Sequence, residues 1–310
     1  MRTSYDVFFL IIHGGVMSDK IEDGMTVLKS HLTLLPAHFS HVLLDRIQQC
    51  IHYEPVIGIM GKTGVGKSSL CNALFKQPLS PVSHSEGCTR TPLRFTLEAG
   101  HRQLTLIDLP GAGESQAYDV EYQQLYKNQL PELDLILWVM KADDRACATD
   151  EAFYQFLLDC GVDPQRMVFV LNQADKAEPS LEWDRERNQP SAQQSETLTQ
   201  RCDAIAHQFS CVNPVYAVSA ATAYNLTCLV EAVILALPRE ASSGVFRQVK
   251  EEHRTQDAET VARNDFGEWV GELIWHLADV LPLPRLIREG LSVVRDGIVC
   301  AAKALWHWFF

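Results

Sequence analysis

Short runs of consecutive apolar residues alternate with amphipathic segments through the middle of the chain. The runs 56–60, 134–140 and 167–171 are bounded by polar turns, which is typical of strands buried on both faces. Between and after them, apolar residues recur at helical spacing, as in 150–160 and 197–209. Strands that alternate with amphipathic helices predict an α/β fold, with a mostly parallel central sheet and helices on both faces.

Two shorter apolar runs, 93–97 and 104–107, predict a hairpin at the edge of this sheet, and 215–218 predicts a further strand. The stretch 178–196 is polar, and Trp183 is its only large apolar side chain. A connection of this length is uncommon in a compact domain unless it is functional or mobile. We therefore expect a functional or mobile loop there.

Helical periodicity at both ends predicts extensions to the α/β domain. The first extension is interrupted at Pro36, and we expect it to pack on the α/β domain. A polar stretch near residue 240 predicts a linker, after which apolar residues return at helical spacing. The expected organisation is a leader (1–17), an N-terminal helical segment (18–54), the α/β domain (55–238), the linker (239–258) and a C-terminal helical segment (259–310).

The two ends leave several interpretations open. The apolar run 7–12 is too short to span a membrane, and it is compatible with a signal peptide or with a disordered leader ahead of a start at Met17. The aromatic end, 305–310, is compatible with core, with a protein contact or with an anchor at a membrane surface. Gly267 and Gly271 form G-x-x-x-G, a weak signal outside an apolar segment.

Composition narrows the class of protein. The 310 residues include 46% apolar residues, enough for a substantial core. The net charge is −12, from 27 basic and 39 acidic residues, which makes a nucleic-acid partner unlikely because such proteins carry basic surfaces. Nine cysteines are scattered without metal-ligand spacing, as in a cytoplasmic protein with reduced thiols.

The strand run 56–60 leads into G-x-x-x-x-G-K-S, which spans Gly61–Ser68. Glycines let a loop wrap closely around phosphate groups, and the helix that follows directs its positive end at them. Lys67 would neutralise phosphate oxygens, and the Ser68 hydroxyl would bind Mg²⁺. A glycine-rich turn with a surface lysine is the alternative, but its position between strand and helix favours a P-loop NTPase fold. The expected phosphate-binding residues are Gly61, Lys62, Thr63, Gly64, Val65, Gly66, Lys67, Ser68 and Ser69.

Two motifs downstream suit the same metal and phosphate. Thr89 lies in a polar loop that would let its hydroxyl reach Mg²⁺. Asp108 ends the second strand of the hairpin and would hold Mg²⁺ through water, while the Gly111 N–H would sense the γ-phosphate. The expected metal ligands are thus Ser68, Thr89 and Asp108, and the expected catalytic residues are Lys67, Thr89 and Gly111.

Two further motifs suit a guanine base. Asp175, in Asn172-Gln173-Ala174-Asp175-Lys176, would accept both N1–H and N2–H of guanine, which adenine does not offer. Ser219 and Ala220 would add a backbone N–H near the guanine O6. Each motif alone is more often a turn or a helix cap. Their order along the chain, each in the loop where it is needed, favours a nucleotide site.

These motifs resemble those of translation-factor-related GTPases of the Era/TrmE type. The segments 108–115 and 141–146, Asp-Leu-Pro-Gly-Ala-Gly-Glu-Ser and Lys-Ala-Asp-Asp-Arg-Ala, are similar to those of a group of bacterial Era-like GTPases often encoded in prophage-like regions. The resemblance covers about 55–238. It implies binding of GTP and GDP with Mg²⁺, slow hydrolysis of GTP, and switch segments near 83–92 and 111–126.

The chain departs from that pattern at several positions. Gln173 replaces a lysine that stacks on the base, and Lys176 would compensate. Ala112 stands where Ras-like proteins have a water-orienting glutamine, and Gly64 stands where potassium-activated members have asparagine. No segment resembles the RNA-binding KH domain of Era.

We therefore expect a Mg²⁺-dependent GTPase that hydrolyses GTP slowly until an unidentified protein effector, or a second copy across the switches, completes the site. One alternative is a nucleotide-gated protein-interaction module. Another is a GTPase bound peripherally to the inner face of the membrane through the aromatic end. An ATP-specific enzyme is the least favoured, because Asp175 selects against adenine.

Overall fold

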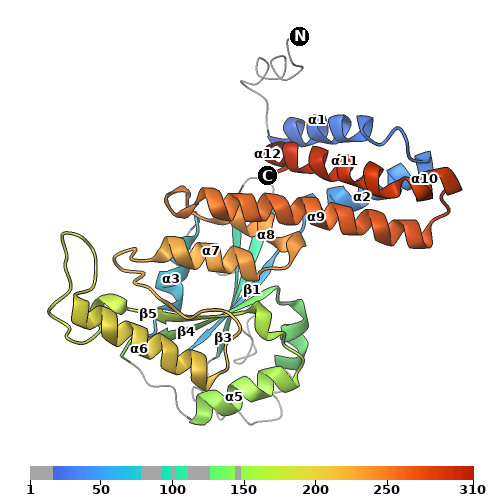
Figure 1. The fold of residues 1–310 in the computed structure, drawn as a ribbon. Helices are drawn as coiled ribbons and strands as arrows, with labels where there is room; N and C mark the ends of the chain where they lie inside the picture. Colours follow the sequence, from blue (N-terminus) through green and yellow to red (C-terminus); the bar gives the residue numbers. More distant parts are fainter. Residues whose placement is uncertain (1–16, 78–92, 100–101, 111–125, 144–147) are drawn as a thin grey trace, which may run out of the picture. The chain divides into compact units, whose positions relative to one another are not determined.

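The computed structural model describes residues 17–77, 93–99, 102–110, 126–143 and 148–310, which form two compact units. The sheet unit is Tyr53–Ala262 (Figure 1). The helical unit combines the chain up to His52 with Arg263–Phe310, so the division falls within one long helix, α9.

The sheet unit is built on six strands in the order β2-β3-β1-β4-β5-β6. All neighbouring strands are parallel except β2 and β3, which form the expected antiparallel hairpin at the edge. The α/β prediction is therefore confirmed. The strands are β1 (Val56–Gly61), β2 (Leu93–Ala99), β3 (Arg102–Pro110), β4 (Leu135–Lys141), β5 (Met167–Asn172) and β6 (Tyr216–Ala217).

Helices cover both faces of this sheet, which explains why β1, β4 and β5 are apolar along most of their length. One face is covered by α5 (Ala148–Asp159) and α6 (Ala192–Gln208), and the other by α3 (Lys67–Leu74), α7 (Leu226–Ala236) and α8 (Arg239–Gln248) (Figure 1). On the first face, Trp138 stacks on Phe169 at 5.3 Å between ring centroids, and Phe169 stacks on Phe209 at 5.0 Å. Buried aromatic rings of this size contribute strongly to core stability.

The stretch expected to be a linker, 239–258, is instead structured. Most of it forms α8, and Ala241, Val245 and Phe246 are buried. Two serines in this helix are buried as well, and the Ser243 hydroxyl donates to the carbonyl of Ala262 at 3.0 Å. Buried serines that bond the backbone make a sequence look polar although it is packed.

The helical unit contains α1 (Met17–Ser30) and α2 (Ala37–Ile51), most of α9 (Gln256–Val280), and α10 (Arg285–Glu289), α11 (Leu291–Ala304) and α12 (Trp306–Phe309). The break between α1 and α2 falls before Pro36, as expected. The helices α1 and α2 belong to the same unit as the C-terminal helices, and α1 contacts both α11 and α12. That the N-terminal helices also pack on the α/β domain stays a prediction.

The aromatic end of the chain belongs to the core of the helical unit. Trp306, Phe309 and Phe310 are buried, and both phenylalanine rings contact Phe266 edge to face. Of the three interpretations left open by the sequence, the core interpretation therefore fits this arrangement. No helix within the described ranges has the length and hydropathy that a membrane crossing requires.

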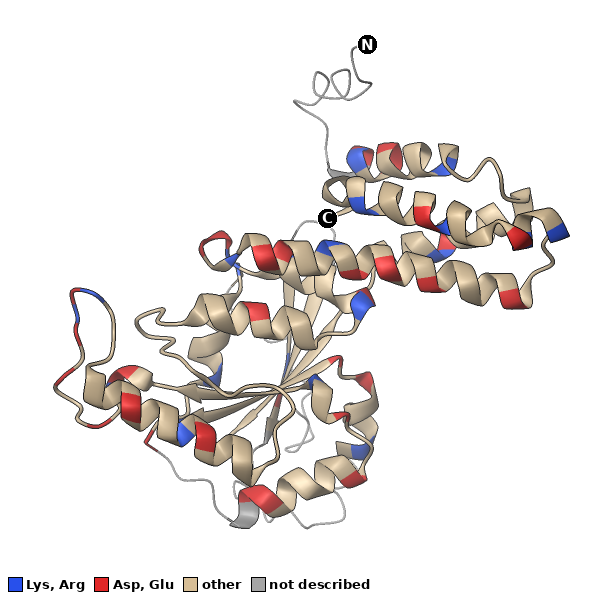
Figure 2. Cartoon of the chain, viewed as in Figure 1, with Lys and Arg blue, Asp and Glu red and all other residues tan. Residues whose placement is uncertain are grey.

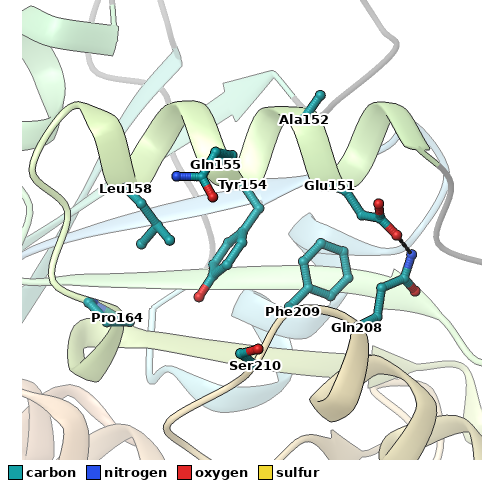
Figure 3. Close-up of a pocket in the computed structure, with 9 residues that line it drawn as sticks. All are labelled: Glu151, Ala152, Tyr154, Gln155, Leu158, Pro164, Gln208, Phe209 and Ser210. Atoms are coloured by element: carbon teal, nitrogen blue, oxygen red, sulfur yellow. Dashed lines mark hydrogen bonds between the residues drawn. The ribbon is translucent and has the colours of Figure 1, made fainter.

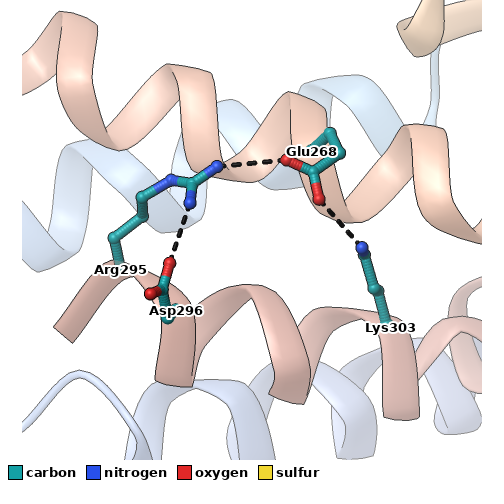
Figure 4. Close-up of polar contacts among 4 residues, drawn as sticks. All are labelled: Glu268, Arg295, Asp296 and Lys303. Carbon is teal, nitrogen blue, oxygen red and sulfur yellow. Dashed lines mark hydrogen bonds and ion pairs between the residues drawn. The ribbon is translucent and has the colours of Figure 1, made fainter. Parts of the chain in front are cut away.

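A network of charged residues joins α9 to α11 within the helical unit. Glu268 accepts from Lys303 at 2.9 Å and from Arg295 at 3.1 Å (Figure 4). Gly267 and Gly271 leave room for these long side chains, because a Cβ at Gly267 would collide with the Lys303 chain and one at Gly271 would lie 2.7 Å from the Arg295 guanidinium. The G-x-x-x-G pattern therefore accommodates Lys303 and Arg295. Elsewhere on the described elements, acidic and basic residues are interspersed (Figure 2).

Candidate functional site

The phosphate loop connects β1 to the first turn of α3, as its sequence predicts. Gly66 has a φ of +91°, and a Cβ there would lie 2.5 Å from the Asn172 amide nitrogen. The position therefore requires glycine for both its conformation and its neighbour. Thr63, Ser68 and Ser69 are exposed, whereas the Val65 side chain is buried. Ser68 is thus exposed in the first turn of α3, at the positive end of this helix.

Lys67 curls back into the phosphate loop. Its Nζ donates to the carbonyl of Gly61 at 2.6 Å and to that of Lys62 at 3.4 Å, and it lies 3.7 Å from an Asp108 carboxylate oxygen. Asp108 reaches this position because β3 is the parallel neighbour of β1. The structure therefore brings together three residues that the sequence predicts for phosphate and metal: Lys67, Ser68 and Asp108.

Lys62, in the phosphate loop, has a partner that sequence reasoning missed. Its Nζ lies 3.2 Å from a carboxylate oxygen of Asp150, whose side chain is only 3% exposed. Asp150 is in the first turn of α5, 88 residues further along the chain. No short motif contains both residues, so only the fold reveals the pair. The contact ties the phosphate loop to the helix that follows β4.

Asn172 joins three loops through one buried side chain. Its amide nitrogen donates to the carbonyl of Val65 at 2.9 Å, and its amide oxygen accepts from the backbone N–H of Ala220 at 3.1 Å. The loops after β1, β5 and β6 therefore meet at one end of the sheet. Parallel strands place their C-terminal loops there, where α/β proteins bind ligands.

The remaining residues predicted for the base lie around this junction. Gln173 donates through Nε2 to the carbonyl of Gly64 at 3.0 Å, and its Oε1 accepts from Lys176 at 3.1 Å. Asp175 accepts a 2.6 Å hydrogen bond from the Ser219 hydroxyl. This bond fixes the Asp175 carboxylate, and it leaves that group acceptor positions for a ligand. Ser219 thus acts through its side chain.

Two predicted residues, Thr89 and Gly111, lie outside the described residues. Among the residues that are described, no group of three or more His, Cys, Asp or Glu side chains could hold a metal by itself. The oxygen donors of Ser68 and Asp108 fit Mg²⁺, which takes few protein ligands and completes its shell with water and phosphate.

A hollow away from these loops lies between α5 and the end of α6, with a volume of about 660 Å³ (Figure 3). Tyr154, Leu158 and Phe209 line it, and Gln208 donates to Glu151 at its rim. It contains none of the motif residues. We therefore assign the candidate site to the loops around Lys67 and Asn172.

The chain is similar to several known proteins. Residues 56–173 match the model of the family described as 50S ribosome-binding GTPase. The chain is 46% identical to the protein YfjP of Escherichia coli K12 over 283 residues, which cover 91% of this chain and 97% of YfjP. It is 45% identical to YkfA of the same organism over 288 residues, covering 93% and 99%. Among solved structures, Aquifex aeolicus Era bound to GDP and AlF4⁻ is 26% identical, with 59% of this chain and 56% of Era covered and a TM-score of 0.43.

Proposed function

The chain belongs to the Era-type family of bacterial GTPases, together with YfjP and YkfA, and from that membership we propose that it is a Mg²⁺-dependent switch that binds GTP and GDP and slowly hydrolyses GTP to GDP and phosphate. The observation that carries the proposal is the bridge made by Asn172. One buried amide holds the phosphate loop, the loop of Asp175 and the loop of Ala220 together. A triphosphate cradle and a base-selecting carboxylate therefore belong to one rigid framework.

The phosphate side of the site relies on charge and on convergent backbone donors. Lys67 is already bonded to loop carbonyls, so on nucleotide binding its ammonium would exchange these for β- and γ-phosphate oxygens. The N-terminus of α3 adds unpaired N–H groups to the same anion. Ser68 and Asp108 would hold Mg²⁺, which neutralises charge on the phosphates when bound.

The base side relies on Asp175. Its carboxylate would accept N1–H and N2–H of guanine while keeping its bond from Ser219. Adenine offers no donor pair at that edge, and a carboxylate left without a partner in a binding site is costly. The site would therefore select guanine nucleotides over adenine nucleotides.

The groups that the described site offers support the proposal of slow hydrolysis. The three carboxylates of the described site are all engaged, Asp108 with Lys67, Asp150 with Lys62 and Asp175 with Ser219, so none is a ready general base for water. In this proposal, a protein effector or a second copy across the switch segments supplies the missing group, and Thr89 and Gly111 report the γ-phosphate.

Titration with GTP, GDP, ATP and xanthosine nucleotides, with and without Mg²⁺, tests the proposal. Guanine nucleotides should bind at least a hundredfold more tightly than ATP, and Asp175→Asn should shift the preference towards xanthosine nucleotides, whose C2 oxygen accepts from the amide. Failure of the wild-type protein to bind GTP or GDP would refute the function. Single-turnover hydrolysis across a dilution series tests the switch, because fast hydrolysis by dilute monomer would contradict it.

A further inference from the structure

A pocket of about 580 Å³ adjoins the Asp175 carboxylate. Its walls come from the long loop after Asp175, through Trp183, Arg185 and Asn188, and from Thr222 in the loop after β6. This volume lies in the usual range for a site that holds a small molecule. Because Asp175 is itself part of the lining, a base held by that carboxylate would lie at or in this pocket, which we call the Trp183 pocket.

The loop that forms the pocket is fixed, although its polar sequence allows a mobile segment. Asp184 and Gln189 exchange two backbone hydrogen bonds, of 2.9 and 3.1 Å, across its tip. The Asn188 amide then ties the tip to the carbonyl of Thr222 at 2.7 Å. At its base, the buried Gln194 amide donates to the carbonyls of Ala177 and Pro179. A wall anchored at both ends is preorganised for a ligand.

Trp183 is packed at the inner end of this wall. Its ring meets Tyr224 edge to face at 5.1 Å and packs against the small cluster that includes Ala174 and Ala177, the residues that flank the Asp175 turn. The indole nitrogen of Trp183 and the hydroxyl of Thr222 are buried without a hydrogen-bond partner in the described structure. Buried polar groups are normally paired, and these two unpaired groups belong to residues that line the Trp183 pocket.

Gln173 and Lys176 flank Asp175 in the sequence, and neither is aromatic. Gln173 bonds the phosphate loop, and Lys176 bonds Gln173. Position 173 therefore brings a neutral amide, held on the phosphate loop, in place of the cation that would stack on the base. Trp183 and Arg185 are the aromatic and cationic side chains that the Trp183 pocket offers beside Asp175, and both types bind well against the face of a base.

We propose that the loop 178–190 is a base-recognition element, in which Trp183 and Arg185 enclose the guanine of a nucleotide whose N1 and N2 edge is held by Asp175. This inference rests on the proposed function and assigns it two specificity-determining residues. Arg185 is exposed on the loop, where it can move onto a bound base, whereas Trp183 is already fixed by packing.

The experiment compares two arginines of the same loop in the full chain. Arg185→Ala should raise the Kd for GDP about fivefold, the upper end of the range for losing an exposed cationic contact to an aromatic face. Arg187→Ala is the matched control, because Arg187 lies in the same exposed loop but does not line the pocket. Its Kd should match that of the wild type.

Tryptophan emission gives a second measurement that does not depend on hydrolysis. GDP should change the emission of the wild-type protein, and Trp183→Phe, which keeps a ring against Tyr224, should abolish the change although five tryptophans remain. Either an unchanged GDP affinity in Arg185→Ala or a persisting emission change in Trp183→Phe overturns the inference. If the inference is overturned but Asp175→Asn still shifts the preference from guanine to xanthine nucleotides, the proposed function stands. If the wild-type protein binds no guanine nucleotide, the proposed function and the inference both fail.

Discussion

Two glycines of the phosphate loop have similar backbone angles but different surroundings. Gly64 and Gly66 have φ values of +81° and +91°, yet a Cβ at Gly64 would meet no atom within 4 Å, whereas one at Gly66 would meet Asn172. The two positions therefore separate the cost of a left-handed backbone from the cost of a displaced neighbour.

In the absence of nucleotide, Gly64→Ala should lower the free energy of unfolding by about 1 kcal/mol, the cost of placing a Cβ in that conformation. Gly66→Ala should lower it by about 3 kcal/mol, because the Asn172 amide must also leave its buried hydrogen bond to Val65. Urea denaturation of both variants measures the difference. Equal losses would show that the Gly66–Asn172 contact contributes nothing.

Asn172→Ala should lower the free energy of unfolding by about 2 kcal/mol, because it leaves a buried carbonyl and N–H unpaired, and it should also weaken GDP binding. Asn213 provides the control, since its amide nitrogen bridges the carbonyls of Gln165 and Met167 beside the other end of β5. Asn213→Ala should reduce stability but leave the Kd for GDP unchanged. Calorimetric titration with GDP distinguishes a general loss of stability from a local effect on the nucleotide site. An equal loss of affinity in both variants would argue against a local role for Asn172.

Sequence reasoning reached Asn172 as part of a motif, but it did not reveal what the side chain holds. Its partners are the carbonyl of Val65 and the N–H of Ala220. Every residue type carries these backbone groups apart from the N–H that proline lacks, so the sequence does not indicate which ones Asn172 bonds. The Lys62–Asp150 pair was missed for a related reason, because a contact between residues so distant in the chain has no local pattern. Motif spacing identifies the residues that would contact the ligand, whereas the groups that hold these residues in place are seen only in the folded structure.

At the scale of elements, the apolar strands were predictable and the polar elements were not. The runs that became β1, β4 and β5 are apolar because helices bury both faces. By contrast, α8 hides two serines and a glycine that packs against Pro55, so its composition resembles a linker. The start of α6 was misplaced because Ser191 and Gln194 form a capping box in a stretch that has little apolar periodicity.

The charged network between α9 and α11 predicts a pH dependence. The hydrogen bond from Lys303, together with the charges of Lys303 and Arg295, holds the pKa of Glu268 below its ordinary value. A carboxylate with a lowered pKa in the folded state stabilises it above the unfolded pKa of about 4.3, and that contribution is lost as the pH falls through the folded pKa.

Glu268→Gln should therefore reduce stability by about 1 kcal/mol at neutral pH, a modest value because the network is partly exposed. The difference from the wild type should shrink as the pH falls below about 4. Glu289, in a more exposed pair with Arg285, is the control, and Glu289→Gln should change stability by less than about 0.5 kcal/mol. Denaturation curves between pH 3 and 7 measure both, and a gap that does not depend on pH would exclude a charge effect.

At the scale of the whole molecule, the division into two units predicts that nucleotide acts on only one of them. All described motif residues belong to the sheet unit, Tyr53–Ala262. A ligand present at a hundredfold excess over its Kd adds about 2.7 kcal/mol to the state that binds it. GDP with Mg²⁺ should therefore raise the melting temperature of the sheet unit and leave that of the helical unit in place.

Calorimetric scans with and without GDP would reveal this as one transition that moves and one that does not. Glu268→Gln gives the opposite control, because its network lies in the helical unit and should lower only the other transition. A single transition that shifts as a whole would mean that the two units unfold together.

Because α1 and α2 share one core with the C-terminal helices, their folding must be completed after translation of the sheet unit. The buried side chains of Leu28, Phe39 and Leu43 leave the exit tunnel long before Phe266 and Phe309 are made. At about 10 residues per second, translation of the intervening sheet unit takes on the order of 20 s. During that interval the apolar faces of the nascent N-terminal helices lack the C-terminal helices that later bury them. We therefore expect a chaperone that binds at the exit of the ribosomal tunnel to bind these faces.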